Sequence, residues 1–175
     1  MKVKNEFREG NMKKVMIIGS PGSGKSTFAR KLKEITGLPL YYLDILWHRS
    51  NKTNISTKEF DMKLYEIIQK DRWIIDGNYQ RTLEMRLKEC DTVFLMDLAL
   101  EVCLSGAQSR IGKEHEDLPW VESEFDEEFK QEIINFPKKQ LPQIYELLKK
   151  YQANKDIIIF KSRKEAEDYL KMISR

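Results

Sequence analysis

The first apolar segment of this chain and the loop after it constrain the fold more than any other feature. Val15 to Ile18 is a short continuous apolar run that ends in glycine, which is typical of a strand buried on both faces. A helix is expected from about Lys25 to Gly37. Between them, Gly19 to Ser26 fits the pattern G-x-x-x-x-G-K-[ST] at every fixed position. A strand, this loop and a helix in that order predict a backbone that curls around phosphate groups.

The chemistry of this loop predicts which ligands it binds. Its glycines let backbone N–H groups point inward, so a phosphate meets several donors and the positive end of the following helix dipole. Lys25 is expected to reach the β and γ phosphates of ATP and to take part in catalysis, while the Ser26 hydroxyl ligates Mg²⁺. The alternative is a glycine-rich turn without a ligand, which the match of both pattern and context disfavours. The residues expected to bind the nucleotide are Gly19, Pro21, Gly22, Ser23, Gly24, Lys25, Ser26 and Thr27.

Short apolar runs alternate with amphipathic segments along the rest of the chain. Further strands are expected at 38–43, 73–75, 92–96 and 157–160, and helices at 56–68, after 77, across 125–148 and from 162. Pro137 and Pro142 are expected to break the long helical region into two pieces. This alternation predicts an α/β, three-layer fold, in which a parallel sheet of about five strands is flanked by helices. Residues 12–175 are expected to form one domain, preceded by a disordered extension at 1–11.

Composition and charge limit which partners we expect and in which cellular compartment the protein lies. The net charge is only +3 and the basic residues are spread along the chain, so no nucleic-acid partner is expected. No stretch approaches the apolar length that spans a bilayer, so no membrane partner is expected either. Cys90 and Cys103 lack the spacing of a disulfide framework or a zinc site, which fits a cytoplasmic protein. We expect a monomer or a homodimer.

Two other classes of protein with this loop do not fit the sequence. A GTPase needs a D-x-x-G switch, which does not occur, and an N-K-x-D motif, whereas Asn154-Lys155-Asp156 is followed by isoleucine. Leu104 to Gln108 looks like the signature of ABC-transporter ATPases. In those proteins an apolar strand ending in Asp-Glu follows, and an acidic stretch follows here. We therefore interpret the segment as part of a helix.

The remaining motifs resemble those of known kinases. The chain resembles the adenylate-kinase-like P-loop small-molecule kinases and, more closely, the bacterial family of topology modulation proteins, from about Met12 to the final helix. The resemblance implies a five-stranded parallel sheet with a small lid, and ATP-dependent transfer of a phosphoryl group to a small acceptor. The acceptor of that family is not established. The matching segments are Ile17 to Lys31, Leu43-Asp44 with Trp47, Asp71 to Tyr79, Arg86-Leu87 and Asp91 to Leu95.

The resemblance also implies roles for single residues. Asp76 and Gly77 match the Asp-Gly that holds Mg²⁺ through water and approaches the acceptor. Arg81 and Arg86 lie near the arginines that bind an acceptor phosphate, or else they form a surface ion pair and a helix-face charge. Asp44, expected at the end of the second strand, would orient or deprotonate an acceptor hydroxyl; the alternative is a helix or turn cap.

The lid departs from the kinase pattern. Only Arg110 and Lys113 precede a run from Glu114 to Glu128 in which eight residues are acidic and none is basic. We expect the lid segment, residues 111–124, to be mobile without ligand, and Arg110 to act in catalysis by closing onto a phosphate. An arginine-poor lid also leaves open a second function, a nucleotide-binding regulator or slow ATPase that acts through a protein or DNA partner.

Overall fold

One parallel sheet forms the centre of the molecule. The computed structural model describes residues 12 to 174, so the expectation for residues 1–11 lies outside the described residues. Within them, five strands pair in the order β2-β3-β1-β4-β5, and every pairing is parallel. The strands are β1 (Lys14–Gly19), β2 (Leu40–Tyr42), β3 (Trp73–Asp76), β4 (Thr92–Met96) and β5 (Asp156–Phe160). The predicted sheet is therefore confirmed.

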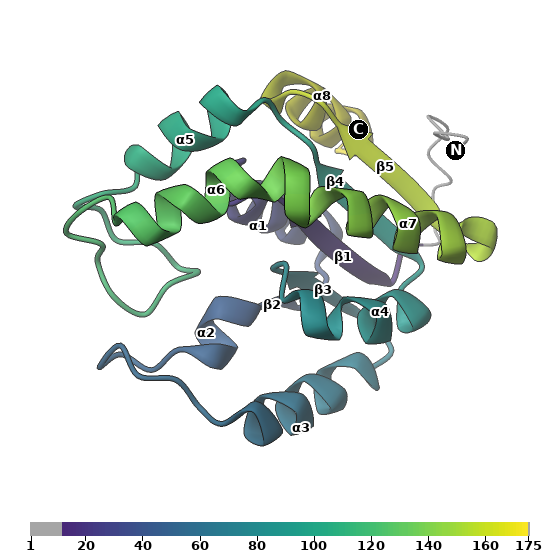
Figure 1. Ribbon diagram of the computed structural model, residues 1–175. Helices are drawn as coiled ribbons and strands as arrows, with labels where there is room; N and C mark the ends of the chain where they lie inside the picture. The colour runs from purple at the N-terminus through teal and green to yellow at the C-terminus, as the bar shows by residue number, and fades with distance from the viewer. Residues whose placement is uncertain (1–11, 175) are drawn as a thin grey trace.

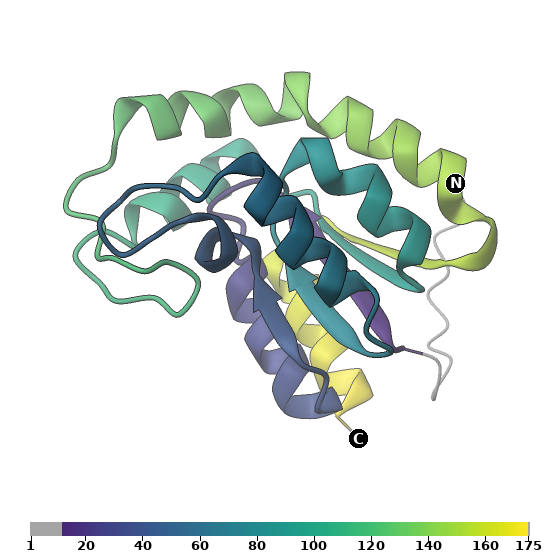
Figure 2. The ribbon, with the colours of Figure 1, turned by 90° about the horizontal axis from the view of Figure 1, so that it is seen from below.

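Helices cover both faces of this sheet and give three layers (Figure 1). Figure 2 shows α6 and α7 on one side of the sheet and α1 and α8 on the other. Among the described residues, no helix is long and apolar enough to cross a membrane. The helices are α1 (Lys25–Thr36), α2 (Leu43–Trp47), α3 (Thr57–Ile68), α4 (Gln80–Glu89), α5 (Leu100–Gln108), α6 (Glu127–Lys139), α7 (Leu141–Tyr151) and α8 (Arg163–Ile173), with a short 3₁₀ turn η1 (Gln152–Asn154).

The central strand β1 shows why the sequence folds into three layers. Its side chains point alternately to the two faces of the sheet, and those of Val15, Met16, Ile17 and Ile18 are fully buried. Met16 and Ile18 pack into a core shared with α3, α4 and α7. Val15 and Ile17 pack with Phe28 of α1 and with residues of α8. A run that is apolar on both faces therefore requires a helical layer on each side.

The second strand ends earlier than predicted, which changes the position of Asp44. Strand β2 pairs with β3 only as far as Tyr42, opposite Asp76, where β3 itself ends. The chain finds no further strand partner there, and it enters the short helix α2 at Leu43, whose side chain is buried. Asp44 thus lies in the first turn of α2 and not at the end of a strand.

The long helical region is broken, as predicted, but not at Pro137. Helix α6 continues through Pro137 to Lys139, and Gln140 separates it from α7. Pro142 lies in the first turn of α7, where its missing N–H removes no intrahelical hydrogen bond. The second proline therefore fits the start of a new helix.

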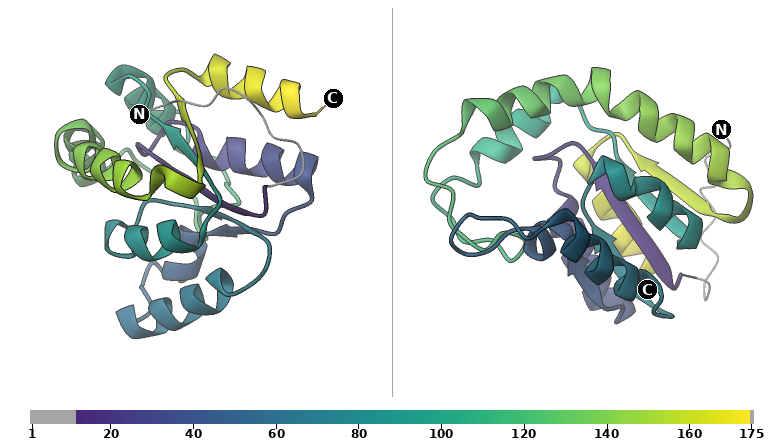
Figure 3. Two further views of the ribbon diagram at one scale, coloured as in Figure 1. Left: turned by 90° about the vertical axis from the view of Figure 1, so that its right-hand side faces the viewer. Right: turned by 60° about the horizontal axis from the view of Figure 1, so that its bottom comes forward.

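The topology opens a crevice above the ends of two neighbouring strands. Strands β1 and β3 are adjacent, yet α1 leaves β1 toward one face of the sheet and α4 leaves β3 toward the other (Figure 3). In open α/β sheets, ligands bind at such a switch point, outside the carboxyl ends of the strands. The loop from Gly19 and the residues after Asp76 meet at this place.

Candidate active site

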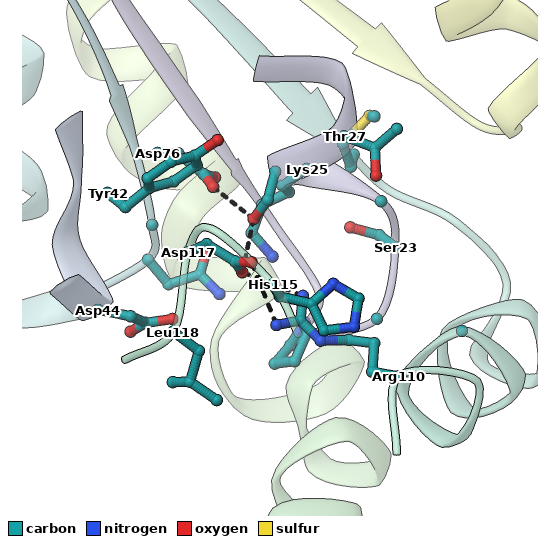
Figure 4. Close-up of a pocket in the computed structure, with 18 of the residues that line it drawn as sticks. Ser23, Lys25, Thr27, Tyr42, Asp44, Asp76, Arg110, His115, Asp117 and Leu118 are labelled. Atoms are coloured by element: carbon teal, nitrogen blue, oxygen red, sulfur yellow. Dashed lines mark hydrogen bonds and ion pairs between the residues drawn. The ribbon is translucent and has the colours of Figure 1, made fainter. Parts of the chain in front are cut away.

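A cavity of about 990 Å³ lies above the carboxyl ends of β1 and β3 (Figure 4). It is lined by the loop after β1, by α2, by the turn after β3, by the lid segment and by α6. In Figure 4, Lys25, Asp76, Asp44 and Asp117 come from different elements and surround the same space. The cavity has the size of a small-molecule site.

The loop has the backbone shape that its glycines predict. Gly22 and Gly24 have φ angles of 77° and 99°, in the left-handed region that favours glycine. Gly24 caps the start of α1, whose first N–H groups have no intrahelical partner. These groups and the helix dipole suit a phosphate chain such as that of ATP, so the loop fits the predicted nucleotide.

Lys25 lies in the cavity and is held by the loop itself. Its Nζ donates a hydrogen bond of 2.9 Å to the carbonyl oxygen of Ser20. Burial lowers the pKa of Lys25, and the nearby carboxylate of Asp76 opposes this shift. The ammonium group is therefore placed where it can exchange a loop carbonyl for a phosphate oxygen.

Ser26 and Asp76 meet at the point where a magnesium ion was predicted. The Ser26 hydroxyl donates to Oδ2 of Asp76 over 2.7 Å. Burial raises the pKa of Asp76 to about 6, while the charge of Lys25 acts in the opposite direction. Oδ1 of Asp76 is buried and has no hydrogen-bond partner among the described residues. A hydroxyl and a carboxylate with a free oxygen fit the ligand preferences of Mg²⁺.

A further carboxylate that the sequence did not single out lies at this point, that of Asp117 in the lid segment. Its Oδ2 lies 2.9 Å from the Ser26 hydroxyl, and the residue is only 8% exposed. Arg110 contacts the same carboxylate through Nη1 and Nη2, over 3.0 and 3.2 Å, and its Nε lies 3.5 Å from Glu122. The lid segment contains no helix or strand, and these polar contacts hold it over the loop. Its mobility without ligand stays a prediction.

Asp44 lies across the cavity from the phosphate loop. Its Oδ1 accepts a hydrogen bond of 2.8 Å from the hydroxyl of Tyr79. Burial raises the pKa of Asp44, and the hydrogen bond from Tyr79 opposes this shift. The Tyr79 ring stacks on Phe60, with centroids 5.1 Å apart, so α3 fixes the position of the hydroxyl. A positioned carboxylate with a raised pKa suits proton transfer.

The two predicted acceptor arginines do not reach the cavity in this structure. Arg81 is exposed and pairs with Asp61, with N–O distances of 2.6 and 2.8 Å, which is the surface ion pair left open as its alternative. Arg86 is fully buried and donates to the carbonyl oxygens of Gly77, Asn78 and Tyr79. Burial lowers the pKa of Arg86 to about 9. Its guanidinium group holds the turn after β3 and does not line the site.

We expect Arg86→Met to lower the free energy of unfolding by about 2 to 4 kcal/mol, because carbonyl groups of a buried turn lose a charged donor. Methionine retains the apolar stem, so packing changes little. Arg81→Met is the matched control from the same helix, and an exposed ion pair contributes less than about 1 kcal/mol. Urea unfolding of both variants measures the difference. Equal stabilities would contradict the structural role of Arg86.

Asn78 joins the two strand ends on either side of the crevice, and sequence reasoning did not assign it to the site. Its side-chain oxygen accepts from the Gly19 N–H over 3.0 Å, and its amide donates to the Gly19 carbonyl over 2.7 Å. The only sequence signal was its position directly after Asp76-Gly77. The pair of hydrogen bonds fixes the start of the phosphate loop relative to Asp76.

The segment Leu104–Gln108 lies in helix α5, as the sequence analysis concluded, and it packs against the phosphate loop. A Cβ atom at Gly106 would lie 2.0 Å from the carbonyl oxygen of Gly22 and 2.4 Å from Nη2 of Arg163. Only glycine lets the helix approach the loop this closely. The resemblance to the ABC-transporter signature therefore has a packing explanation.

Gly106→Ala is expected to lower the free energy of unfolding by about 1 to 3 kcal/mol, because a backbone oxygen at 2.0 Å must move. The gain in helix propensity, about 1 kcal/mol, acts in the opposite direction and is smaller than such a clash. The variant should also bind Mg·ATP more weakly, since Gly22 moves. Ser105→Ala, on the exposed side of the same helix, is the control. Thermal melting and calorimetric titration report both effects, and a stabilised Gly106→Ala variant would be inconsistent with this packing.

Comparisons with known proteins bear on the fold and on the class of protein. A scan against models of protein families finds no match. The chain is 33% identical over 86 residues to the adenylate kinases of Thermotoga petrophila and Thermotoga maritima. That stretch covers 47% of this chain and 38% of each of those kinases, so the chain spans well under half of their length.

Solved structures extend the likeness over nearly the whole chain. The shikimate kinase from Acinetobacter baumannii in complex with shikimate matches 93% of this chain and 91% of its own, with a TM-score of 0.62 and 18% identity. The shikimate kinase from Bacteroides thetaiotaomicron matches 93% and 96%, with a TM-score of 0.55 and 14% identity. None of these relatives is a topology modulation protein, so that resemblance stays a prediction. The sheet order, the phosphate loop and these likenesses together show that the chain has the P-loop kinase fold.

Proposed function

We propose that this protein transfers the γ-phosphoryl group of ATP to a small acceptor. One observation carries the proposal: a complete phosphate loop and a positioned carboxylate, Asp44, face each other across one cavity. The partial sequence likeness to adenylate kinases and the fold shared with shikimate kinases support this reading. The acceptor class is a nucleotide or a hydroxylated metabolite, and the finer family is that of the topology modulation proteins.

Each residue then has a separate task in the transfer. The loop N–H groups and Lys25 bind the phosphates, while Ser26 and Asp76 hold Mg²⁺, Asp76 through water. When bound, Mg²⁺ neutralises charge that develops on the phosphate oxygens. Asp44 orients the acceptor hydroxyl and takes its proton, and the Tyr79 hydroxyl holds the carboxylate in place. Gly77 lines the cavity, and in this proposal its backbone approaches the acceptor.

Arg110 is the arginine that our proposal assigns to catalysis. It lies near the phosphate loop because its partner Asp117 contacts Ser26. In the ligand-bound protein, Arg110 would turn from Asp117 to a phosphate oxygen. We further propose that residues 12–175 act as one cytoplasmic domain, as a monomer or homodimer, without a nucleic-acid partner.

Arg81, Arg86 and Arg110 already have partners in this structure, and this favours a second function, that of an ATP-binding regulator or slow ATPase. Arg110 is engaged by two carboxylates, and Arg81 and Arg86 are engaged outside the cavity. Fast phosphoryl transfer usually relies on several fixed cations at the transferring group. If these three arginines stay occupied, the site would hydrolyse ATP slowly and the protein would act through its conformation.

A screen of nucleoside monophosphates and hydroxylated metabolites, with Mg·ATP and detection of ADP, tests the proposal. Acceptor-dependent ADP formation by the wild type, accompanied by a phosphorylated product in phosphorus NMR, is the expected result. Lys25→Ala should show neither. Slow ADP formation that no acceptor accelerates would overturn the kinase and support the regulator.

A further inference from the structure

We propose that Asp117 of the lid segment is a ligand to the divalent cation, so that the cation binds without nucleotide and holds the lid segment over the phosphate loop. In the nucleotide-free protein the three protein ligands are then the hydroxyl of Ser26, the carboxylate of Asp117 and the carboxylate of Asp76, which would contact the cation directly in this state and through water once the nucleotide is bound. The consequence for turnover rests on the proposed function, because a phosphotransferase of this kind uses Mg²⁺. The cation site itself rests on the geometry alone.

The first observation is that three side-chain oxygen atoms, from Ser26, Asp76 and Asp117, lie close together around one hydroxyl hydrogen. Oδ2 of Asp76 lies 2.7 Å from the Ser26 hydroxyl oxygen, and Oδ2 of Asp117 lies 2.9 Å from it. A serine hydroxyl has one hydrogen, so it can donate to only one of these two carboxylates at a time. The other carboxylate oxygen therefore lies close to the Ser26 oxygen with no hydrogen between them. A cation among these oxygens would remove the repulsion.

The second observation is a buried carboxylate oxygen that nothing satisfies. Asp76 is only 5% exposed, it lines the cavity, and its Oδ1 has no hydrogen-bond partner among the described residues. Leaving such a group without a partner is unfavourable by several kcal/mol in general. In Figure 4, Asp76 and Asp117 lie close together in the cavity, with the end of Lys25 nearby.

The neighbouring basic groups do not supply the missing partner. Arg110 donates to Asp117 and lies near Glu122, and the Nζ of Lys25 donates to the carbonyl oxygen of Ser20. The described residues contain no group of three or more histidine, cysteine, aspartate or glutamate side chains suited to a metal ion. Here the third ligand is a hydroxyl, and two carboxylates with a hydroxyl form a set of oxygen ligands that suits Mg²⁺ or Mn²⁺.

The position of Asp117 in the chain gives this ligand a regulatory effect. Ser26 and Asp76 lie at the ends of β1 and β3, whereas Asp117 belongs to the segment between α5 and α6. Three residues further on, the Trp120 ring packs edge-on against His48, which follows α2, with centroids 5.0 Å apart. A cation bound by all three ligands would therefore tie the lid segment to the loop and stabilise its contact with the region after α2.

Titration of the nucleotide-free protein with Mn²⁺, followed by electron paramagnetic resonance, tests the site directly. We expect one Mn²⁺ per chain, displaced by Mg²⁺. Asp117→Asn should weaken Mn²⁺ binding at least tenfold, and Asp117→Glu should restore part of it. The matched control is Glu116→Gln, which removes a neighbouring exposed charge and should leave binding unchanged. Equal Mn²⁺ affinities for wild type and Asp117→Asn would overturn the proposal.

A second measurement does not depend on the folding of the Asp117 variants. Tryptophan fluorescence of the nucleotide-free wild type should change on addition of Mg²⁺, and Trp120→Phe should abolish the change. No response to Mg²⁺ would argue against closure by the cation. If instead Asp117→Asn bound metal-free ATP more tightly and the wild type bound no Mn²⁺, Asp117 would be a competitor of the phosphates and the proposal would be wrong. If Mn²⁺ binds but the screen finds no acceptor, the cation site remains supported and the proposed phosphotransferase activity does not.

Discussion

Replacing Lys25 by alanine should weaken Mg·ATP binding more than a hundredfold. Its Nζ lies in the cavity beside the phosphate loop, where it donates a hydrogen bond to the carbonyl oxygen of Ser20. Hydrogen bonds from a charged donor contribute about 1.5 to 3 kcal/mol each, and Lys25 is expected to contact two phosphates. A loss of about 3 to 5 kcal/mol corresponds to two or more powers of ten in affinity.

Isothermal titration calorimetry with Mg·ATP measures this effect. Lys33→Ala is the matched control, because it removes an exposed lysine from the same helix. Circular dichroism must show that the Lys25→Ala protein is folded. Unchanged affinity in the folded variant would rule out the proposed nucleotide site.

Asp44→Asn should leave Mg·ATP affinity within about a factor of two and lower phosphoryl transfer by about 10² to 10⁴, the usual contribution of a general base. Asparagine keeps the side-chain oxygen that accepts from Tyr79 and removes only the charge. Asp44 lies on α2, away from the loop residues that hold the phosphates. Binding and transfer should therefore separate in this variant.

The pH dependence of transfer gives a second test of Asp44. A general base acts only when it is ionised, so the rate should fall as the pH falls through its pKa. Since burial raises that pKa, the acidic limb should lie above the ordinary range of an aspartate. Stopped assays of kcat against pH measure the limb, which Asp44→Asn should abolish. Asp61→Asn, which changes a partly exposed aspartate on α3, should retain it. An unfolded Asp44→Asn protein would favour the capping role instead.

Much of the fold followed from local sequence patterns. The loop pattern after an apolar run predicted the strand, the turn and the helix, because φ angles open to glycine and the N–H groups of a helix start are properties of consecutive residues. The helix predicted from residue 56 is also present, and the Ser56 side chain caps it by accepting from the Glu59 N–H. Burial of Arg86 could have been foreseen, since it shares a helix face with Leu83 and Leu87.

The sequence alone determined the phosphate loop, the parallel sheet and the position of Asp76 at a strand end, because each depends on short-range spacing and on apolar periodicity. Only the tertiary structure decided which side chains meet across the cavity. Asp117 reaches Ser26 over 91 positions in the chain, and Tyr79 reaches Asp44 over 35. One aspartate among eight acidic residues carries no local signal that distinguishes it. Its role follows from packing, because the lid segment buries that carboxylate against the loop and leaves most of its neighbours in water.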